Sequence, residues 1–190
     1  MSVPLDPLTP LAFLERTLRV YPSKTALRYG PLRWSWEEFG QRVSQLAGAL
    51  LRAGIAPGDR VAFLTPNTPE LLLAHFACLL VRAPLVAINT RLRREEVAYI
   101  LQHSGAKLVF VDPELASEVE AGGAPARFVS VEDPVAGFTG APLGGPTYAR
   151  FVAGATPVPV RAEVDDEDRV LAINYTSGTT GRPKGVLYTH

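Results

Sequence analysis

The stretch Tyr175-Thr-Ser-Gly-Thr-Thr-Gly-Arg-Pro-Lys-Gly185 holds three glycines, four serine or threonine residues and one lysine within eleven positions. Glycines let backbone N–H groups approach an anion closely, because no Cβ stands in the way, and hydroxyl groups add further donors. Lys184 supplies a positive charge suited to terminal phosphate oxygens. The composition of residues 175–185 therefore predicts a loop that binds a polyphosphate.

The spacing within this stretch excludes two well-known nucleotide-binding motifs. A Walker A loop requires G-x-x-x-x-G-K-[ST], but Pro183 stands five positions after Gly178, and no serine or threonine follows Lys184. The chain contains no G-x-G-x-x-G, so the dinucleotide-binding fingerprint is absent as well. Apolar runs over 169–174 and 186–188 flank the stretch, which predicts a loop between two strands and not a loop that opens a helix.

Upstream of this stretch, short apolar runs alternate with segments that have helical periodicity. Ser35 and Glu38 form a capping-box pattern, and Gly54 stands where a glycine would end the helix that follows. Thr68 followed by Pro69 is a second helix-start pattern. The expected elements are a hairpin over 26–29 and 32–34, helices over 35–53, 68–81, 93–103 and 114–120, and strands over 60–64, 85–88, 107–111 and 127–131. This alternation predicts an α/β fold with a mainly parallel sheet covered on both faces by helices.

The segment from residue 132 to 160 has a different composition. Five prolines and five glycines fall between Glu132 and Pro159, which predicts an excursion from the α/β pattern with one helical turn around Tyr148–Val152. An acidic run over 163–168 follows. It lacks the D-x-D-x-D-G spacing of a calcium loop and is therefore expected to be a solvated linker.

Composition argues against several classes of partner. Nineteen basic residues balance nineteen acidic ones in the 190-residue chain, so no net charge attracts it to nucleic acid or to an anionic membrane. The longest apolar run, Leu71–Val81, has about half of the roughly 20 residues that a membrane span needs. The single cysteine, Cys78, excludes an intrachain disulfide, and no signal-peptide pattern is present. We expect a cytoplasmic protein with small-molecule partners.

Several side chains that could carry chemistry are expected to be structural instead. Cys78 lies among apolar residues of a helix that is apolar nearly all round, and this helix is predicted to be buried. His75 in the same helix is expected to be a core or interface histidine, and His103 is expected to cap the helix that it closes. A charged helix start is expected to be solvated, and it comprises Arg91, Arg93, Arg94, Glu95 and Glu96.

Residues 174–190 resemble the phosphate loop of the adenylate-forming enzymes, a superfamily of acyl-CoA synthetases, aryl-CoA ligases, luciferases and adenylation domains. The match is close at nearly every position of Tyr175–Gly185, and similarity continues upstream in the order of the family. The upstream segments are Trp34-Ser-Trp-Glu-Glu-Phe39, Gly58-Asp-Arg-Val-Ala62, Pro66-Asn-Thr-Pro-Glu70, Ile88-Asn-Thr-Arg-Leu92 and Ile100-Leu-Gln-His-Ser-Gly-Ala-Lys107. The resemblance implies that residues 1–190 are the N-terminal part of the large domain of such an enzyme.

The resemblance also implies a two-step reaction. A carboxylate attacks the α-phosphate of ATP and releases pyrophosphate, and the acyl group then passes from the adenylate to the thiol of coenzyme A. Lys184 would be the catalytic residue that contacts the leaving pyrophosphate, and Thr176 would lie near the phosphates and Mg²⁺. The implied nucleotide-binding residues are Thr176, Ser177, Gly178, Thr179, Thr180, Gly181, Lys184 and Gly185. The acid is expected to be a short- or medium-chain fatty acid.

Other parts of such an enzyme would follow the phosphate loop in the family. They include the acidic Mg²⁺ ligand, the aspartate that binds the ribose, and the lid domain with its lysine. We therefore expect an incomplete large domain without the C-terminal lid, inactive by itself, which associates with a complementary C-terminal fragment or with a second copy. Two alternatives stay open: an adenylation domain or aryl-acid ligase with another acceptor, and a non-catalytic nucleotide-binding module.

Overall fold

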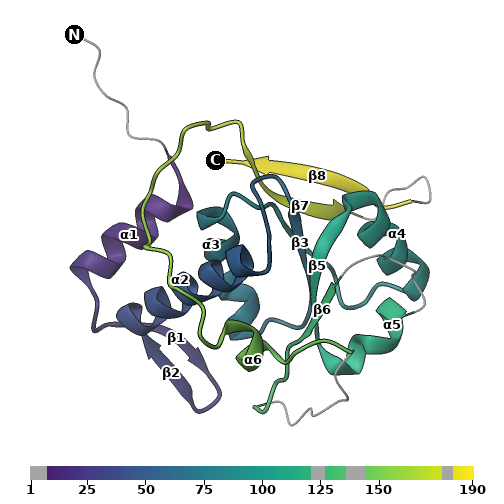
Figure 1. The fold of residues 1–190 in the computed structure, drawn as a ribbon, viewed down its shortest axis with the longest axis horizontal. Coiled ribbons are helices and arrows are strands. Elements are labelled where there is room, and N and C mark those ends of the chain that lie inside the picture. Colours follow the sequence, from purple (N-terminus) through teal and green to yellow (C-terminus); the bar gives the residue numbers. More distant parts are fainter. Residues whose placement is uncertain (1–7, 121–126, 136–143, 177–181) are drawn as a thin grey trace.

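The computed structural model describes residues 8–120, 127–135, 144–176 and 182–190. Within them, six strands form one sheet in the order β6-β5-β3-β4-β7-β8, and every neighbouring pair is parallel except β7 with β8. The strands are β3 (Arg60–Leu64), β4 (Leu85–Ala87), β5 (Ala106–Val111), β6 (Arg127–Ser130), β7 (Val170–Thr176) and β8 (Lys184–Thr189). The predicted α/β fold with a mainly parallel sheet is confirmed (Figure 1).

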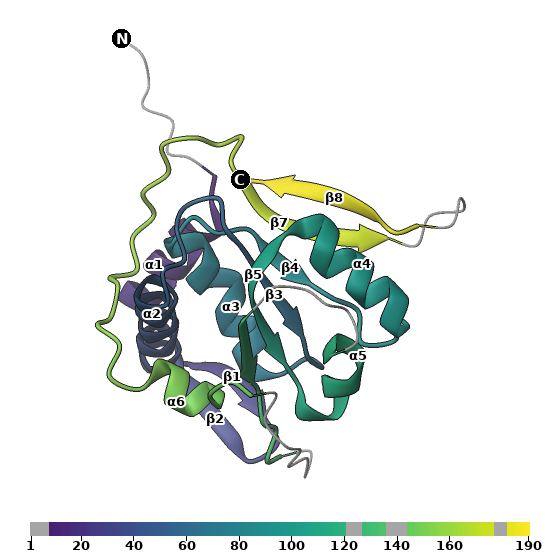
Figure 2. The ribbon, with the colours of Figure 1, turned by 45° about the vertical axis from the view of Figure 1, so that its right-hand side comes forward.

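Helices cover both faces of the sheet, as Figure 2 shows most clearly. One face carries α1 (Pro10–Val20), α2 (Trp36–Arg52), α3 (Pro69–Leu80) and α6 (Tyr148–Val152), and the other carries α4 (Arg94–Ser104) and α5 (Ala116–Glu120). A short 3₁₀ turn, η1 (Pro113–Leu115), precedes α5, and a hairpin of β1 (Thr25–Tyr29) and β2 (Leu32–Ser35) lies beside α2. No helix in the described part of the chain is long and apolar enough to cross a membrane.

The core on each face follows from the two-residue period of the central strand β3. Val61 and Phe63 belong to the buried cluster on the α2 and α3 side, where the Phe63 ring stacks on Phe110 with centroids 4.3 Å apart. Ala62 and Leu64 belong to a second cluster on the α4 side. A strand buried on both faces has an uninterrupted apolar sequence, and this is why β3 is recognisable from sequence alone.

Helix α2 begins and ends where its sequence predicts. The Ser35 hydroxyl accepts from the Glu38 N–H at 3.2 Å, and the Glu38 carboxylate accepts from the Ser35 N–H at 2.7 Å. These reciprocal bonds form the predicted capping box and satisfy donors that would otherwise lack a partner. Gly54 follows the helix with φ of +78°, a left-handed conformation that glycine adopts without strain.

Helix α1 is not among the elements expected from the sequence, although its start signal is present. Thr9 is the N-cap, its hydroxyl accepts from the Leu11 N–H at 3.3 Å, and Pro10 occupies the first turn. Within the helix, only Leu11 and Leu14 are buried. Leu11, Leu14 and Leu18 recur at helical spacing on the side of the helix that faces the core, so the period was present and the sequence analysis did not use it.

The expectation that α3 is buried all round is wrong. Leu73, Ala74 and Cys78 pack against α2 and the sheet, but Leu72 is 40% exposed and His75 is exposed as well. The uncovered side of α3 borders a cavity of about 400 Å³ next to β1. An apolar sequence on every side of a helix does not reveal which side the rest of the fold covers.

After α6 the chain runs along the outside of α2 until it reaches β7 (Figure 1). The Val158 N–H donates to the Ser44 carbonyl at 3.0 Å, and the Ser44 hydroxyl donates to the Val158 carbonyl. At Gly48 the two backbones approach so closely that an added Cβ would lie 1.9 Å from the carbonyl oxygen of Thr156. Within the described part of residues 132–160, the helical turn expected around Tyr148–Val152 is present as α6.

We predict that Gly48→Ala destabilises the protein, because the new methyl group would collide with the Thr156 carbonyl, which is backbone and cannot rotate away. The free energy of unfolding is expected to fall by about 1–3 kcal/mol, the usual cost of overpacking. Urea denaturation of the purified chain measures it. Gln41→Ala, an exposed change in the same helix, serves as control and should stay within about 0.5 kcal/mol. Equal stability of both variants would contradict the close approach.

Candidate functional site

The stretch predicted to bind phosphate connects the two strands of an antiparallel hairpin. Strand β7 ends at Thr176 and β8 begins at Lys184, and these two exposed residues form the last pair of the ladder. The other residues predicted for the loop lie outside the described residues: Ser177, Gly178, Thr179, Thr180 and Gly181. The hairpin thus brings one hydroxyl and one ammonium group of the predicted site to the same place.

The position of the hairpin in the sheet also suits a ligand site. Strand β7 runs parallel to β4, with Leu85 opposite Ala172, so its carboxyl end lies at the same edge as the carboxyl ends of β3, β4 and β5. In open α/β sheets, ligands bind outside the carboxyl ends of the strands. Thr176 is the residue with which β7 ends at this edge.

Gly185 has a packing role in addition to the predicted contact with nucleotide. It pairs with Tyr175 across the hairpin, and an added Cβ would lie 3.2 Å from the Ile173 Cγ2 and 3.4 Å from the Tyr175 Cζ. The missing side chain leaves room for the Tyr175 ring to lie across β8. Its contact with the nucleotide stays a prediction.

Tyr175 reaches across to α4, a contact that sequence reasoning missed. Its hydroxyl lies 2.8 Å from the Nδ1 of His103, and the two rings meet edge to face with centroids 5.8 Å apart. His103 in turn stacks on Tyr99, one helical turn earlier, at 5.3 Å. His103 does lie in the last turn of α4, as expected, but its ring contacts the start of the phosphate stretch. The two positions are 72 residues apart, so no local pattern links them.

The chain belongs to the AMP-binding enzyme family. The family model matches residues 14–190, which include the hairpin and its loop as well as most of the fold. The chain is 38% identical over 188 residues to 4-hydroxybutyrate–CoA ligase 2 of Metallosphaera sedula, a match that covers 96% of this chain and 34% of that enzyme. It is 34% identical to the peroxisomal benzoate–CoA ligase of Arabidopsis thaliana, covering 97% of this chain and 34% of that one.

The solved structure of another CoA ligase contains the fold of this chain. The anthranilate CoA ligase AuaEII, determined in complex with anthranoyl-AMP, superposes with a TM-score of 0.86 and 25% sequence identity. The match covers 97% of this chain and 35% of that enzyme. This AMP-binding enzyme chain therefore spans about a third of the length of the relatives that it matches. The resemblance inferred from the sequence motifs is confirmed.

The described residues of this AMP-binding enzyme fit a magnesium ion only as a partner of bound phosphate. No three His, Cys, Asp or Glu residues in the described part of the chain converge on a metal-sized site. Mg²⁺ keeps several waters and substrate phosphate oxygens and requires only one or two protein oxygens. The exposed hydroxyl of Thr176, at the mouth of the loop, could be one such ligand.

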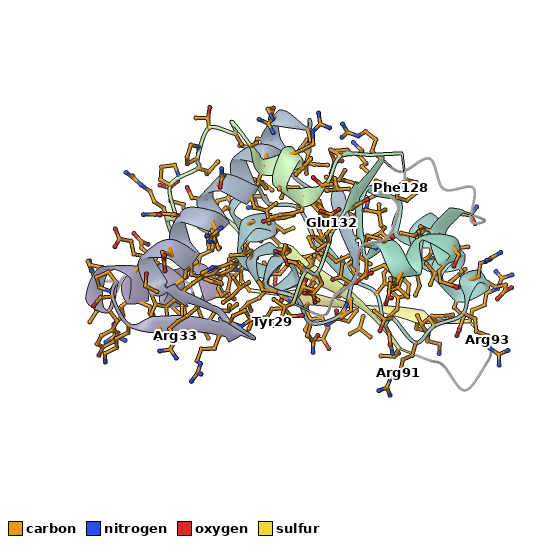
Figure 3. The ribbon with its side chains drawn as sticks, turned by 90° about the horizontal axis from the view of Figure 1, so that it is seen from below. Tyr29, Arg33, Arg91, Arg93, Phe128 and Glu132 are labelled. Atoms are coloured by element: carbon orange, nitrogen blue, oxygen red, sulfur yellow. The ribbon has the colours of Figure 1, made fainter. Side chains whose placement is uncertain are left out.

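Polar side chains also occur at the start of α4 and in the cavity beside β1 of this AMP-binding enzyme. Arg91 and Arg93 point outward near the start of α4, which confirms the expected solvated helix start (Figure 3). The cavity of about 400 Å³ beside β1 is lined in part by Asn67, Thr68 and His75. Among the residues predicted to bind nucleotide, those that the structure describes, Thr176, Lys184 and Gly185, do not line it.

Cys78 is a packing residue, as predicted. Its side chain is fully buried in α3, and this burial raises the pKa of the thiol to about 12. Removal from water penalises the charged thiolate, so the reactive form is scarce at neutral pH. The cysteine therefore has no chemical role at the site.

We predict that Cys78 does not react with a thiol reagent such as DTNB in the folded protein at pH 8. Its pKa is raised, so the thiolate stays rare until the pH approaches 12, and the side chain is also inaccessible. Absorbance at 412 nm should rise only after the chain is unfolded in guanidinium chloride. Rapid modification under native conditions would contradict the burial of this residue.

Proposed function

We propose that this chain carries the phosphate-binding part of an AMP-forming acid–thiol ligase that uses ATP and coenzyme A. The observation that supports this most directly is the pairing of Thr176 with Lys184 at the carboxyl edge of the sheet. These residues flank a stretch whose glycines and hydroxyls suit a triphosphate, in a family described as AMP-binding. A hydroxyl and an ammonium group on facing strands can contact one polyphosphate together.

In this proposal the loop acts by electrostatic stabilisation. When a carboxylate attacks the α-phosphate of ATP, negative charge builds up on the departing pyrophosphate. The ammonium of Lys184, together with backbone and hydroxyl donors of residues 176–181, stabilises that charge as it forms. Mg²⁺, when bound with ATP, would neutralise phosphate charge and take one oxygen ligand from Thr176. The charge on Lys184 also orients the terminal phosphates, which aligns the α-phosphate for attack.

The names of the relatives indicate which acid the enzyme activates. The name of the relative from Metallosphaera sedula supports a short-chain acid, in line with the short- or medium-chain acid inferred from the motifs. The names of the benzoate and anthranilate ligases favour an aryl acid as the second candidate. We propose coenzyme A as the acceptor, since all three names are those of CoA ligases.

We propose further that activity requires the portion that the relatives have beyond this third of their length. Strand β8 supports this, because it is an edge strand whose Val186, Leu187 and Tyr188 are 40%, 59% and 51% exposed. Exposed apolar residues on an unpaired edge favour association with another segment or with a second copy of the chain.

A cytoplasmic location suits the single, reduced cysteine.

The proposal can be tested in a chimera in which this chain replaces the matching first third of the Metallosphaera sedula ligase. We expect the chimera to catalyse 4-hydroxybutyrate-dependent exchange of pyrophosphate into ATP. Lys184→Ala should lower the exchange rate by about 10- to 100-fold, because the charge on the leaving group loses its ammonium partner. The Michaelis constant for the acid should change little.

A matched control for this variant is Lys24→Ala, which removes an exposed lysine near the β1–β2 hairpin. It should leave the exchange rate unchanged. If both lysine variants lost activity equally, or if Lys184→Ala weakened acid binding as much as turnover, the assignment of Lys184 to the phosphates would be wrong.

The isolated 190-residue chain is expected to show no carboxylate-dependent exchange. The acid pocket and the ribose contacts would come from the other two thirds of the relatives' length. Incubation with ATP, labelled pyrophosphate and 4-hydroxybutyrate measures it, with the chimera as positive control. Robust exchange by the chain alone would overturn this part of the proposal.

A further inference from the structure

Both ends of the phosphate stretch contact the same turn of α4. At the first end, the Tyr175 hydroxyl lies 2.8 Å from the Nδ1 of His103. At the second end, the Arg182 guanidinium lies over the ring of Tyr99, 5.6 Å from its centroid. Tyr99 and His103 are four residues apart on one helix face and stack with an interplanar angle of 25°. We call these two side chains the α4 platform.

Tyr175 contacts His103 through both its hydroxyl and its ring. Burial raises the pKa of the Tyr175 phenol, with a smaller contribution from Tyr99 beside it, so the hydroxyl stays protonated well above neutral pH. A protonated phenol can donate to the Nδ1 of His103 or accept from it, according to the tautomer of the imidazole. The edge-to-face geometry of the two rings, with an interplanar angle of 85°, adds an aromatic contact. The first residue of the phosphate stretch is thus tied to the helix by both ring and hydroxyl.

The platform itself is firmly attached to the sheet. On the inner side of α4, Val97 and Ile100 are fully buried. At the end of the helix, Arg60 of β3 donates from its Nε to the Ser104 carbonyl at 2.5 Å and from its Nη2 to the Gly105 carbonyl at 3.1 Å. These bonds satisfy carbonyls that would otherwise lack a partner at the helix end. A ligand loop anchored here is anchored to the central strand of the sheet.

Arg182 and Lys184, the two cationic residues of the stretch, have different partners. A guanidinium over an aromatic face gains about 0.5–1 kcal/mol at an exposed site. The Arg182 guanidinium contacts the Tyr99 ring of the α4 platform, whereas Lys184 lies on β8 opposite Thr176. Pro183, between them, is buried, which fixes the chain where it enters β8.

From these contacts we propose that Tyr99 and His103 are positioning residues that hold both ends of the phosphate loop on α4 before the nucleotide binds. The inference deepens the proposed function and rests on it for the identity of the ligand. Holding Tyr175 and Arg182 in place beforehand lowers the entropy that is lost when a ligand binds at the end of the hairpin, so affinity for the triphosphate rises without a new contact to it. Neither side chain needs to touch ATP.

The first test needs no nucleotide and uses the 190-residue chain. Tyr175→Phe removes the hydroxyl and keeps the ring. We expect amide hydrogen exchange in residues 174–176 and 184–186 to accelerate about fivefold, the effect of losing one hydrogen bond. Tyr188→Phe makes the same chemical change on β8, where the ring is exposed, and should leave exchange unchanged. Equal rates in both variants and the parent chain would refute the anchoring of the hairpin by α4.

The second test uses the chimera described above and compares His103→Ala with His103→Asn. An asparagine can place a polar atom where the Nδ1 was, so it should restore the contact in part. We expect His103→Ala to raise the Michaelis constant for ATP about five- to tenfold and His103→Asn to raise it less. The Michaelis constant for the acid should stay the same in both. Equal effects on ATP and acid, or no rescue by asparagine, would show a merely structural role.

The two tests separate the two proposals. If the parent chimera shows no pyrophosphate exchange at all, the proposed function fails, but amide hydrogen exchange still decides whether α4 anchors the hairpin. If pyrophosphate exchange is robust and Tyr175→Phe leaves amide hydrogen exchange unchanged, the platform proposal fails and the proposed function stands. Thermal melting of each variant identifies any that fails to fold. If Tyr175→Phe is such a variant, His103→Ala, which removes the other partner of the same contact, replaces it in the first test.

Discussion

The position of the β7–β8 hairpin against α4 depends on the parallel pairing of β7 with β4. Between α6 and β7 the chain runs along α2, and Arg82 and Arg169 both pair with Asp165, at 3.1 and 2.6 Å, just before it enters the sheet. Once β7 lies beside β4, its carboxyl end is at the carboxyl edge of the sheet, and its Tyr175 comes within reach of α4. A different neighbour for β7 would move Tyr175 away from that helix.

A polyphosphate bound as proposed here would be held without a helix N-terminus. In a Walker A site, a helix N-terminus follows the loop and offers its free N–H groups and dipole to the phosphates. Here an antiparallel strand follows, so donors must come from the loop and from the two ends of the hairpin. The geometry of those ends then matters more than in a helix-capped loop. The contacts of Tyr175 and Arg182 with α4 supply a fixed support that the hairpin alone does not provide.

The glycine at 185 illustrates how two requirements can act on one position. Its place in the sequence motif suggests a contact with nucleotide, whereas its place in the hairpin is under the ring of Tyr175. A Cβ at this position would lie 3.2 Å from the Ile173 Cγ2, a tight contact, whereas its distance of 3.4 Å from the Tyr175 ring is an ordinary one. Packing against Ile173 and the predicted contact with nucleotide therefore favour the same small residue.

Much of this protein follows from local sequence. The capping box at Ser35, the proline after Thr68 and the apolar run of β3 act within a few residues, so they specify elements wherever the rest of the chain lies. The predicted α/β class follows from their alternation, and the chemistry of residues 175–185 follows from composition. Helix α1 has local signals of the same kind, the N-cap at Thr9, Pro10 after it and leucines at helical spacing, but the sequence analysis did not use them.

Only the tertiary structure decided which surfaces meet. The exposed side of α3 and the contact of His103 with Tyr175 depend on the placement of elements far apart in the chain, and no periodicity encodes that placement. The sequence by itself predicted a phosphate-binding stretch and determined that strands and helices alternate before it. Where the two ends of that stretch lie, beside α4 at the carboxyl edge of the sheet, was decided by strand order, because hydrogen bonds between strands join residues irrespective of their separation in sequence.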